Sequence, residues 1–318
     1  MRFLIVVLMA LLAVPPASAQ DCRPRKVASL DIVGMESGLI KIKILIDGTP
    51  RYFLVDTGGI YSTIYSDVAD RLELQRIPLD QNVEIYDVVG SLARQYVDAR
   101  DVEIGPLRAR RIAMIVDHRA AADHALDGTL APDVLDKFDL DFDVAARKLN
   151  LFAPATCDGS PVYWTADFVS IPFDKSLSHI VLPMVLDGRA VGTTIDTGSS
   201  TTVLNERIAA NLFGIDAASS GMERIPGAAP DDLFQYRYQF KSLSIQGLVI
   251  KDPLVYILPD LANEAFHKKH LDKIDLDPIY AARLIVPQLI VGTDVLSRLH
   301  LYISYAQSRL YVSQVNAH

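Results

Sequence analysis

The sequence contains one pattern twice, and this duplication limits the fold more than any other feature. The first copy covers residues 39–72 and reads LIKIKILIDGTPRYFLVDTGGIYSTIYSDVADRL. The second lies 140 residues later, covers 179–212 and reads HIVLPMVLDGRAVGTTIDTGSSTTVLNERIAANL. In each copy, alternating apolar residues flank an Asp-Gly pair, which predicts a β-hairpin. Two copies are too few for a solenoid, so we expect two similar lobes that face each other.

The two copies also end alike. Residues 131–152 read APDVLDKFDLDFDVAARKLNLF and match residues 292–312, GTDVLSRLHLYISYAQSRLYV. Each predicts a short helical turn at Asp-Val-Leu, followed by two strands. The second copy is longer, and we place its additional residues in the polar, helix-like segment 260–283. We expect the carboxylates of DKFDLDFD, residues 136–143, to be solvated, because they alternate with apolar residues as on a strand surface.

These patterns predict an all-β, bilobal chain with short helices. The turn-forming residues CDGSP at 157–161 separate two strand-rich halves. We therefore expect an N-terminal lobe over 20–156 and a C-terminal lobe over 157–318. Each lobe is long enough to bury its own core.

The first 19 residues predict a secretory signal peptide. Arg2 precedes an apolar run from Phe3 to Val14, and Ala17-Ser18-Ala19 forms a small-residue cleavage site. The alternative is an N-terminal membrane anchor, although the run is shorter than the ~20 residues of a spanning helix. We expect export to the periplasm or the medium, with no stable membrane insertion of the mature chain.

Two cysteines, Cys22 and Cys157, follow the predicted cleavage site. In an oxidising compartment one disulfide between them is expected, and the alternative is two free thiols. The bridge would tie the mature N-terminus to the junction of the lobes.

The remaining signals exclude several classes of partner. The formal net charge is −8 and no block of lysine and arginine is present, which argues against nucleic acid. The HKKH stretch at 267–270 has no third ligand at a useful spacing, so we interpret it as a solvated helix face and expect no metal or cofactor. The histidines His118, His124 and His300 have no obvious nucleophile as a partner.

The chemistry of the duplicated Asp-Thr-Gly loops points to a pair of carboxylates, Asp56 and Asp196. An aspartate at the end of a buried strand is costly unless its charge is shared. Two carboxylates at a lobe interface do not both ionise easily, so one holds a proton while the other does not. Such a pair can activate a bound water and protonate a carbonyl oxygen, which is general acid–base hydrolysis.

The residues after each aspartate have supporting roles in this interpretation. Glycine lets the backbone approach the carboxylate closely. The threonine hydroxyls can hydrogen-bond across to the opposite loop, and the hydroxyl of Ser199 can hydrogen-bond the outer oxygen of Asp196. The predicted supporting residues are Thr57, Gly58, Thr197, Gly198 and Ser199.

The duplicated apolar-apolar-Asp-Thr-Gly motif resembles that of the aspartic peptidases of the pepsin and retropepsin kind. The resemblance covers nearly the whole mature chain and is closest to retropepsin-like units fused in one exported bacterial chain. It implies an endopeptidase with the dyad Asp56 and Asp196, a polypeptide substrate held between the lobes, and no need for dimerisation.

The chain departs from the family pattern in the first lobe. Ala131 stands where the family has a glycine, which the second lobe supplies as Gly292, and Gly59 stands where serine or alanine is commoner. A methyl group at Ala131 either crowds the first Asp loop or is accommodated by it. These departures motivate a rival interpretation, a catalytically weak or inactive protein of this fold that binds a peptide or an envelope partner.

Two further expectations concern the surroundings of the dyad. The resemblance implies β-hairpin flaps, and spacing suggests Tyr86, Gly90 and Gly227; an ordinary surface hairpin is the alternative. A glycoside hydrolase also uses two carboxylates, but these stand ~5–10 Å apart. Asp-Thr-Gly loops should place theirs closer, so we rank that activity lower.

Overall fold

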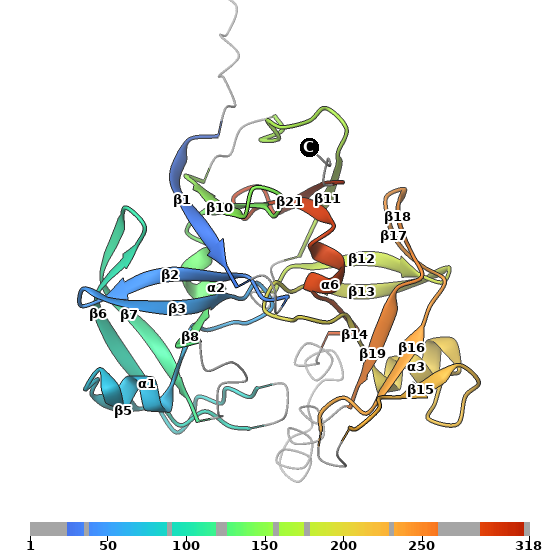
Figure 1. Cartoon of the computed structure of the whole chain (residues 1–318), viewed down its shortest axis with the longest axis horizontal. Helices are drawn as coiled ribbons and strands as arrows, with labels where there is room; N and C mark the ends of the chain where they lie inside the picture. The colour runs from blue at the N-terminus through green and yellow to red at the C-terminus, as the bar shows by residue number, and fades with distance from the viewer. Residues whose placement is uncertain are drawn as a thin grey trace, which may run out of the picture.

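The computed structural model describes residues 24–34, 38–87, 91–118, 126–154, 159–174, 179–228, 232–259 and 287–314. It is mostly β-structure arranged in two lobes beneath a shared sheet, which agrees with the predicted all-β, bilobal class (Figure 1). The elements of the first half are β1 (Lys26–Val33), β2 (Lys41–Ile46), β3 (Thr49–Val55), β4 (Thr63–Tyr65), α1 (Ser66–Arg71), β5 (Arg76–Pro78), β6 (Gln95–Ile104), β7 (Leu107–Asp117), β8 (Gly128–Leu130), α2 (Pro132–Leu135), β9 (Asp139–Asp143) and β10 (Lys148–Phe152).

The second half repeats this order. Its elements are β11 (Val169–Pro172), β12 (Val181–Leu186), β13 (Arg189–Ile195), β14 (Val203–Asn205), α3 (Glu206–Phe213), β15 (Met222–Arg224), β16 (Tyr236–Gln239), β17 (Ser242–Ile245), β18 (Leu248–Lys251), β19 (Leu254–Leu258), β20 (Leu289–Val291), α6 (Thr293–Leu296), β21 (Leu299–Ser304) and β22 (Arg309–Gln314).

The Asp-Gly pairs form the predicted hairpin turns. Asp47 and Gly48 have φ values of 47° and 71°, and Asp187 and Gly188 have 42° and 79°. Positive φ at both central residues is the conformation that matches the twist of two-residue hairpins, and aspartate and glycine tolerate it best. β2 pairs with β3 and β12 pairs with β13 across these turns, so both hairpin predictions are confirmed.

The N-terminal lobe is a closed barrel of six strands. They follow the order β2-β3-β8-β4-β7-β6, and a pairing of β2 with β6 closes the ring. Within it β3 and β8 run parallel, with Val55 beside Leu130. The last residue of β3 is therefore held inside the barrel wall, directly before Asp56.

The C-terminal lobe follows the same path with one interruption. β13 lies parallel to β20, as β3 lies parallel to β8. The long hairpin β6–β7 is replaced by four shorter strands, β16 to β19, because the chain breaks at Phe240–Lys241 and at Asp252–Pro253. Proline lacks an amide donor, so it cannot continue the ladder at that point.

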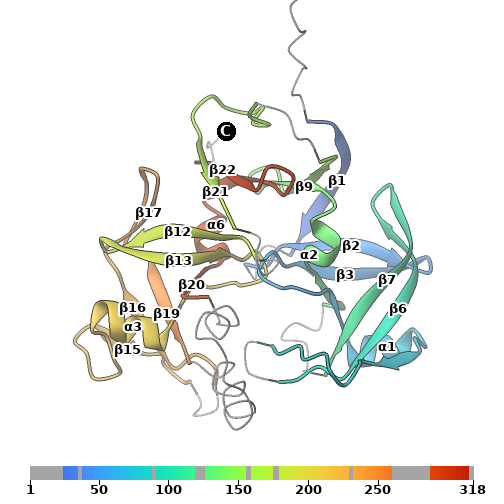
Figure 2. The same cartoon turned by 180° about the vertical axis from the view of Figure 1, so that it is seen from behind.

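A six-stranded sheet joins the two halves in the order β11-β22-β21-β9-β10-β1. At its centre β9 and β21 are antiparallel neighbours, with Asp141 opposite Tyr302. The sheet lies above both lobes, with the β2–β3 and β12–β13 hairpins meeting below it, in the front and back views (Figures 1 and 2).

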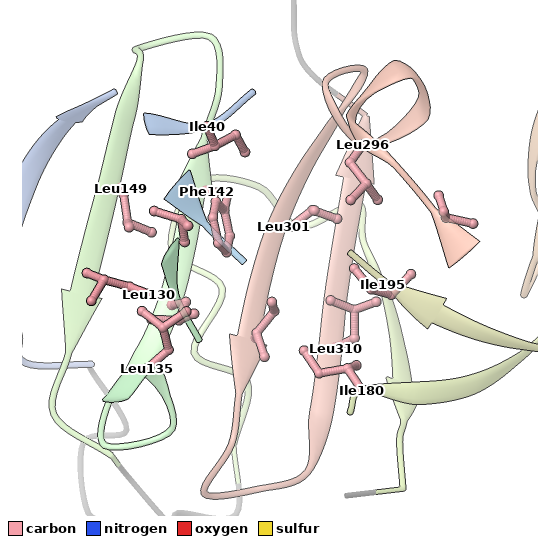
Figure 3. Packing of buried hydrophobic residues seen from close by; sticks show 14 of the residues in the cluster. Ile40, Leu130, Leu135, Phe142, Leu149, Ile180, Ile195, Leu296, Leu301 and Leu310 are labelled. Atoms are coloured by element: carbon pink, nitrogen blue, oxygen red, sulfur yellow. The ribbon is translucent and has the colours of Figure 1, made fainter. Parts of the chain in front are cut away.

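The hydrophobic core continues from one lobe to the other beneath this sheet. Figure 3 shows two facing groups of side chains, one from each half of the chain. The first group contains Ile40, Leu130, Leu135, Phe142 and Leu149, and the second contains Ile180, Ile195, Leu296, Leu301 and Leu310. Ile180 is the counterpart of Ile40, so the duplication extends to the packing of the core.

The prediction that the carboxylates of segment 136–143 are solvated was wrong for two of them. Asp139 and Asp141 are buried, with 1% and 0% exposure. Asp141 accepts hydrogen bonds from Tyr163 Oη (2.6 Å) and Asn150 Nδ2 (3.0 Å) and contacts His300 Nε2 at 2.6 Å. For Asp141 the cause is remote in sequence, because Tyr163 bonds it and Trp164 stacks on His300 beside it. Asp139 instead accepts a hydrogen bond from Ser304 Oγ at 3.0 Å.

Several predictions lie outside the described residues. These are the signal peptide, both cysteines of the expected disulfide, Gly90 and the whole helix-like segment 260–283. The lobe boundary within 157–161 also remains a prediction. Within the described part of the chain, no helix is both long enough and apolar enough to span a bilayer.

Candidate active site

The two Asp-Thr-Gly loops meet between the lobes. Asp56 directly follows β3, and its N–H donates to the carbonyl oxygen of Leu130 at 2.9 Å. Asp196 directly follows β13, and its N–H donates to the carbonyl oxygen of Val291 at 3.0 Å. Each aspartate is therefore fixed by the strand that lies parallel to its own, and the barrel wall determines where each carboxyl begins.

The threonines bind each loop to the opposite one. Thr57 Oγ1 donates to the carbonyl oxygen of Ile195 at 2.7 Å, and Thr197 Oγ1 donates to that of Val55 at 2.6 Å. The N–H of each threonine in turn donates to the hydroxyl of the other, at 3.3 and 3.1 Å. Both side chains are fully buried. Every polar group in this reciprocal set has a partner, as buried polar groups require.

The glycines of the two loops lie against the opposite carboxyls. A Cβ at Gly58 would stand 2.3 Å from Cγ of Asp196, and one at Gly198 would stand 2.6 Å from Cγ of Asp56. Real Cβ atoms do not approach other atoms so closely, so both positions require glycine. The close approach also brings the carboxyls within hydrogen-bonding reach of each other.

Burial dominates the electrostatics of the pair. It raises the pKa of Asp56, against the N–H groups of Gly59 and Gly58, which donate to Asp56 Oδ1 at 2.7 and 3.0 Å. Burial and then the charge of Asp56 raise the pKa of Asp196 well above its usual value. Two carboxyls so close cannot both ionise readily, so the pair retains a proton at a pH at which ordinary aspartates have lost theirs.

A hydrogen-bonded pair of a hydroxyl residue and an aspartate lies behind each loop, and it was not predicted from the sequence. Ser62 donates to Asp133 Oδ1 through both its N–H (3.0 Å) and its hydroxyl (2.7 Å). Thr202 bonds Asp294 in the same way, at 3.0 and 2.7 Å. Both aspartates belong to the repeated Asp-Val-Leu turns. Their repetition beside a hydroxyl residue at matching positions was a signal available in the sequence.

Ala131 does not displace the first loop. It is fully buried, and its N–H donates to Ser62 Oγ at 3.0 Å. Its methyl group occupies space that Gly59 leaves open, since a Cβ at Gly59 would lie 3.3 Å from that of Ala131. In the second lobe the choice is reversed: Ser199 has the side chain, and a Cβ at Gly292 would stand 2.4 Å from the carbonyl oxygen of Thr201.

The predicted role of the Ser199 hydroxyl was wrong. That hydroxyl donates to the carbonyl oxygen of Thr201 at 2.7 Å, so it closes its own loop. Asp196 is bonded by backbone N–H groups instead: that of Gly198 at 2.7 Å, and that of Ser199, which lowers its pKa.

Tyr86 and Gly227 are the two predicted flap residues that the structure describes. Tyr86 forms a bridge with Leu92, and its hydroxyl donates to Glu84 at 3.2 Å. Gly227 lies in the turn region between β15 and β16, with a φ of 77°. In Figure 1 the hairpin between β5 and β6 extends toward the middle of the molecule below the meeting point of the lobes. A covering role for these residues stays a prediction.

Comparison with protein families decides the classification. Residues 42–129 match a model described as a gag-polyprotein putative aspartyl protease, and residues 182–295 match one described as an aspartyl protease. Each match contains one Asp-Thr-Gly loop, and together they cover more than half of the chain. The chain belongs to the retropepsin-like aspartyl proteases. It has two such domains, and no curated protein matches it significantly.

Proposed function

We propose that this retropepsin-like chain is an aspartic endopeptidase whose dyad is Asp56 and Asp196. The observation that carries the proposal is the reciprocal arrangement of the two loops. The threonines cross between the lobes, the glycines lie against the opposite carboxyls, and burial raises the pKa of both aspartates.

The geometry suits the activation of one water by two carboxyls. The ionised carboxylate takes a proton from the water, and the water oxygen bonds to the carbonyl carbon of the substrate. The protonated carboxyl gives its proton to the carbonyl oxygen. Collapse of the tetrahedral intermediate breaks the C–N bond as the nitrogen accepts a proton from the dyad, and no covalent enzyme intermediate forms.

The substrate of this proposed reaction is an extended polypeptide bound between the lobes. Such a chain adds to exposed strand edges through its main chain. Because both loops belong to one chain, the dyad needs no second copy. We further propose export after cleavage near Ala19, which rests on the charge and apolar run of residues 1–19.

The rival function, peptide binding without cleavage, was motivated by Ala131 and Gly59. Ala131 and Gly59 fill one space between them and leave the hydrogen bonds of Asp56 in place. We therefore favour catalysis.

The test is digestion of a diverse peptide library by the purified protein from pH 3 to pH 8. We expect cleavage by the wild type, none by Asp196→Asn, and inhibition by a peptide with a hydroxyl group in place of the scissile carbonyl. Folded wild-type protein that cleaves nothing at any pH would contradict the proposal and favour the binding function.

A further inference from the structure

A histidine adjoins the dyad in one lobe only. His179 precedes β12, and the residue at the same position of the first copy is Leu39, which precedes β2. The two loops are otherwise alike in their backbone hydrogen bonds. The position therefore introduces an ionisable group on one side of a nearly symmetric site.

The imidazole of His179 contacts the first loop across the lobe interface. The carbonyl oxygen of Gly58 acts on the ring as a hydrogen-bond acceptor, and the charge of Asp56 acts on it as well. Its Nδ1 is buried and has no hydrogen-bond partner among the described residues. Because water does not screen a buried ring, the charge of a neighbouring group acts on it strongly.

Neutral groups occupy the corresponding place on the other side. The hydroxyl of Thr293 donates to the carbonyl oxygen of Gly38, and a Cβ on Gly38 would lie 3.7 Å from that of Ser200. Next along the chain, Leu39 has no ionisable atom. The second loop thus receives no cation from the first lobe at this position.

We propose that His179 breaks the symmetry of the dyad, because its imidazole favours the ionised carboxylate on Asp56 and so leaves the shared proton on Asp196. Asp56 is then the base that activates water, and Asp196 is the acid. The proposal rests on the peptidase function above, and it assigns to His179 a positioning role, not a catalytic one.

The surroundings of His179 support this direction. Burial is the largest influence on the ring and holds the pKa of His179 below its usual value, whereas the Gly58 carbonyl and Asp56 act in the opposite direction. His179 in turn lowers the pKa of Asp56, whereas burial and then the charge of Asp56 raise the pKa of Asp196. The backbone of Asp174 pairs with that of Val181, two residues after His179. The charge of Asp56 also acts on Tyr305, but this phenol is neutral because burial raises its pKa.

The sign of the pH effect follows from these contacts. Below its lowered pKa the ring of His179 is protonated and stabilises the singly ionised dyad, so this active form persists to lower pH than it would beside a neutral residue. Removal of the imidazole should raise the pH at which the acid side of the kcat/KM profile falls. An opposite charge at close range shifts a carboxyl pKa by about 1–3 units, and we expect a shift of roughly 1.

The direct test is NMR titration of His179, assigned by the resonance that His179→Gln removes. In Asp56→Asn the pKa of His179 should fall, because the anion beside it is lost. In Asp196→Asn it should stay or rise, because Asp56 then has no proton to share. Equal shifts in both variants, or none, would overturn the proposal. This reading does not depend on whether the protein cleaves peptides, so it separates this proposal from the peptidase function.

Kinetics provide a second readout if the wild type is active. His179→Gln keeps a hydrogen-bond donor without the charge, and His179→Leu installs the residue of the first lobe. Both variants should raise the pH of the acid limb of the kcat/KM profile, whereas Leu39→Ala should leave that pH unchanged. If the role of His179 were purely structural, His179→Leu would lower kcat and His179→Gln would restore it. The pH of the acid limb would then be the same in both variants as in the wild type, which would contradict the proposal.

Discussion

The Asp-Thr-Gly loops of the two lobes have the same backbone arrangement and differ in how the space around it is filled. In the first lobe Gly59 leaves room that the methyl group of Ala131 occupies. In the second lobe Ser199 has the side chain, and Gly292 provides the room. The hydrogen bonds from loop N–H groups to the carboxyls are kept in both. The comparison teaches that the family glycine is a requirement of volume, which a compensating change can relax.

The sheets behind the loops differ more than the loops do: the first closes into a barrel, and the second is an open sheet in the described residues. The first lobe has one long hairpin of β6 and β7, and the second divides it into four short strands. The parallel neighbours that hold the aspartates, β8 and β20, are the same in both. The part of each lobe that positions the dyad is therefore repeated, while the outer hairpin varies.

The largest expected effect tests whether the lobes contribute equally to catalysis. Asp56→Asn and Asp196→Asn should each lower kcat/KM by about 10²–10⁴-fold or more, because each removes one half of the acid–base pair. Assays with the best peptide of the library would measure this. An Asp133→Asn control that keeps most activity would show that the loss is specific to the dyad and does not follow from removing any buried carboxylate.

The next effect tests whether the space at Gly292 in the second lobe is smaller than the space at Ala131 in the first. Gly292→Ala should destabilise the protein by about 1–3 kcal/mol, because the new methyl group meets the carbonyl oxygen of Thr201. Ala131→Gly should cost only about 1 kcal/mol, since it removes one buried methyl group. Urea unfolding would measure both. Equal losses would mean that the two positions do not differ in available volume.

The crossing threonines offer a comparison in which the lobes should agree. Thr57→Ala and Thr197→Ala should each cost about 1–3 kcal/mol, because each leaves a buried carbonyl and a buried N–H of the opposite lobe without a partner. Serine at either position keeps the hydroxyl and should recover most of the loss. An alanine variant as stable as the wild type would show that the hydroxyls do not hold the lobes together.

The smallest effect is a dependence of stability on pH. The pKa of Asp196 is raised in the folded state, so above its unfolded value near 3.8 the folded chain holds more protons than the unfolded chain. Stability therefore falls as pH rises from about 4 through the folded pKa. Asp196→Asn should remove this loss and raise Tm at pH 7 more than at pH 4. A Tm difference that does not change with pH would contradict the assigned pKa shift.

The sequence was sufficient for the elements that repeat. The Asp-Gly turns, the Asp-Thr-Gly loops and the Asp-Val-Leu helices follow from local sequence patterns that occur in both halves of the chain. It was insufficient where burial depends on a remote segment: Asp139 and Asp141 alternate like surface residues, yet Ser304 bonds the first and Tyr163 bonds the second. The position of His179 beside the dyad was not predicted for a related reason. It departs from the repeat and contacts Gly58 only when the two lobes are packed together.

The most direct test of the central claim, one dyad shared by two lobes of a single chain, is a mixing experiment. Purified Asp56→Asn and Asp196→Asn proteins would be assayed alone and as an equimolar mixture, against wild type at the same total concentration. We predict that all three preparations are inactive, because no chain in the mixture has both aspartates. Activity in the mixture would show that the dyad forms between chains, and activity in either variant alone would show that one aspartate suffices.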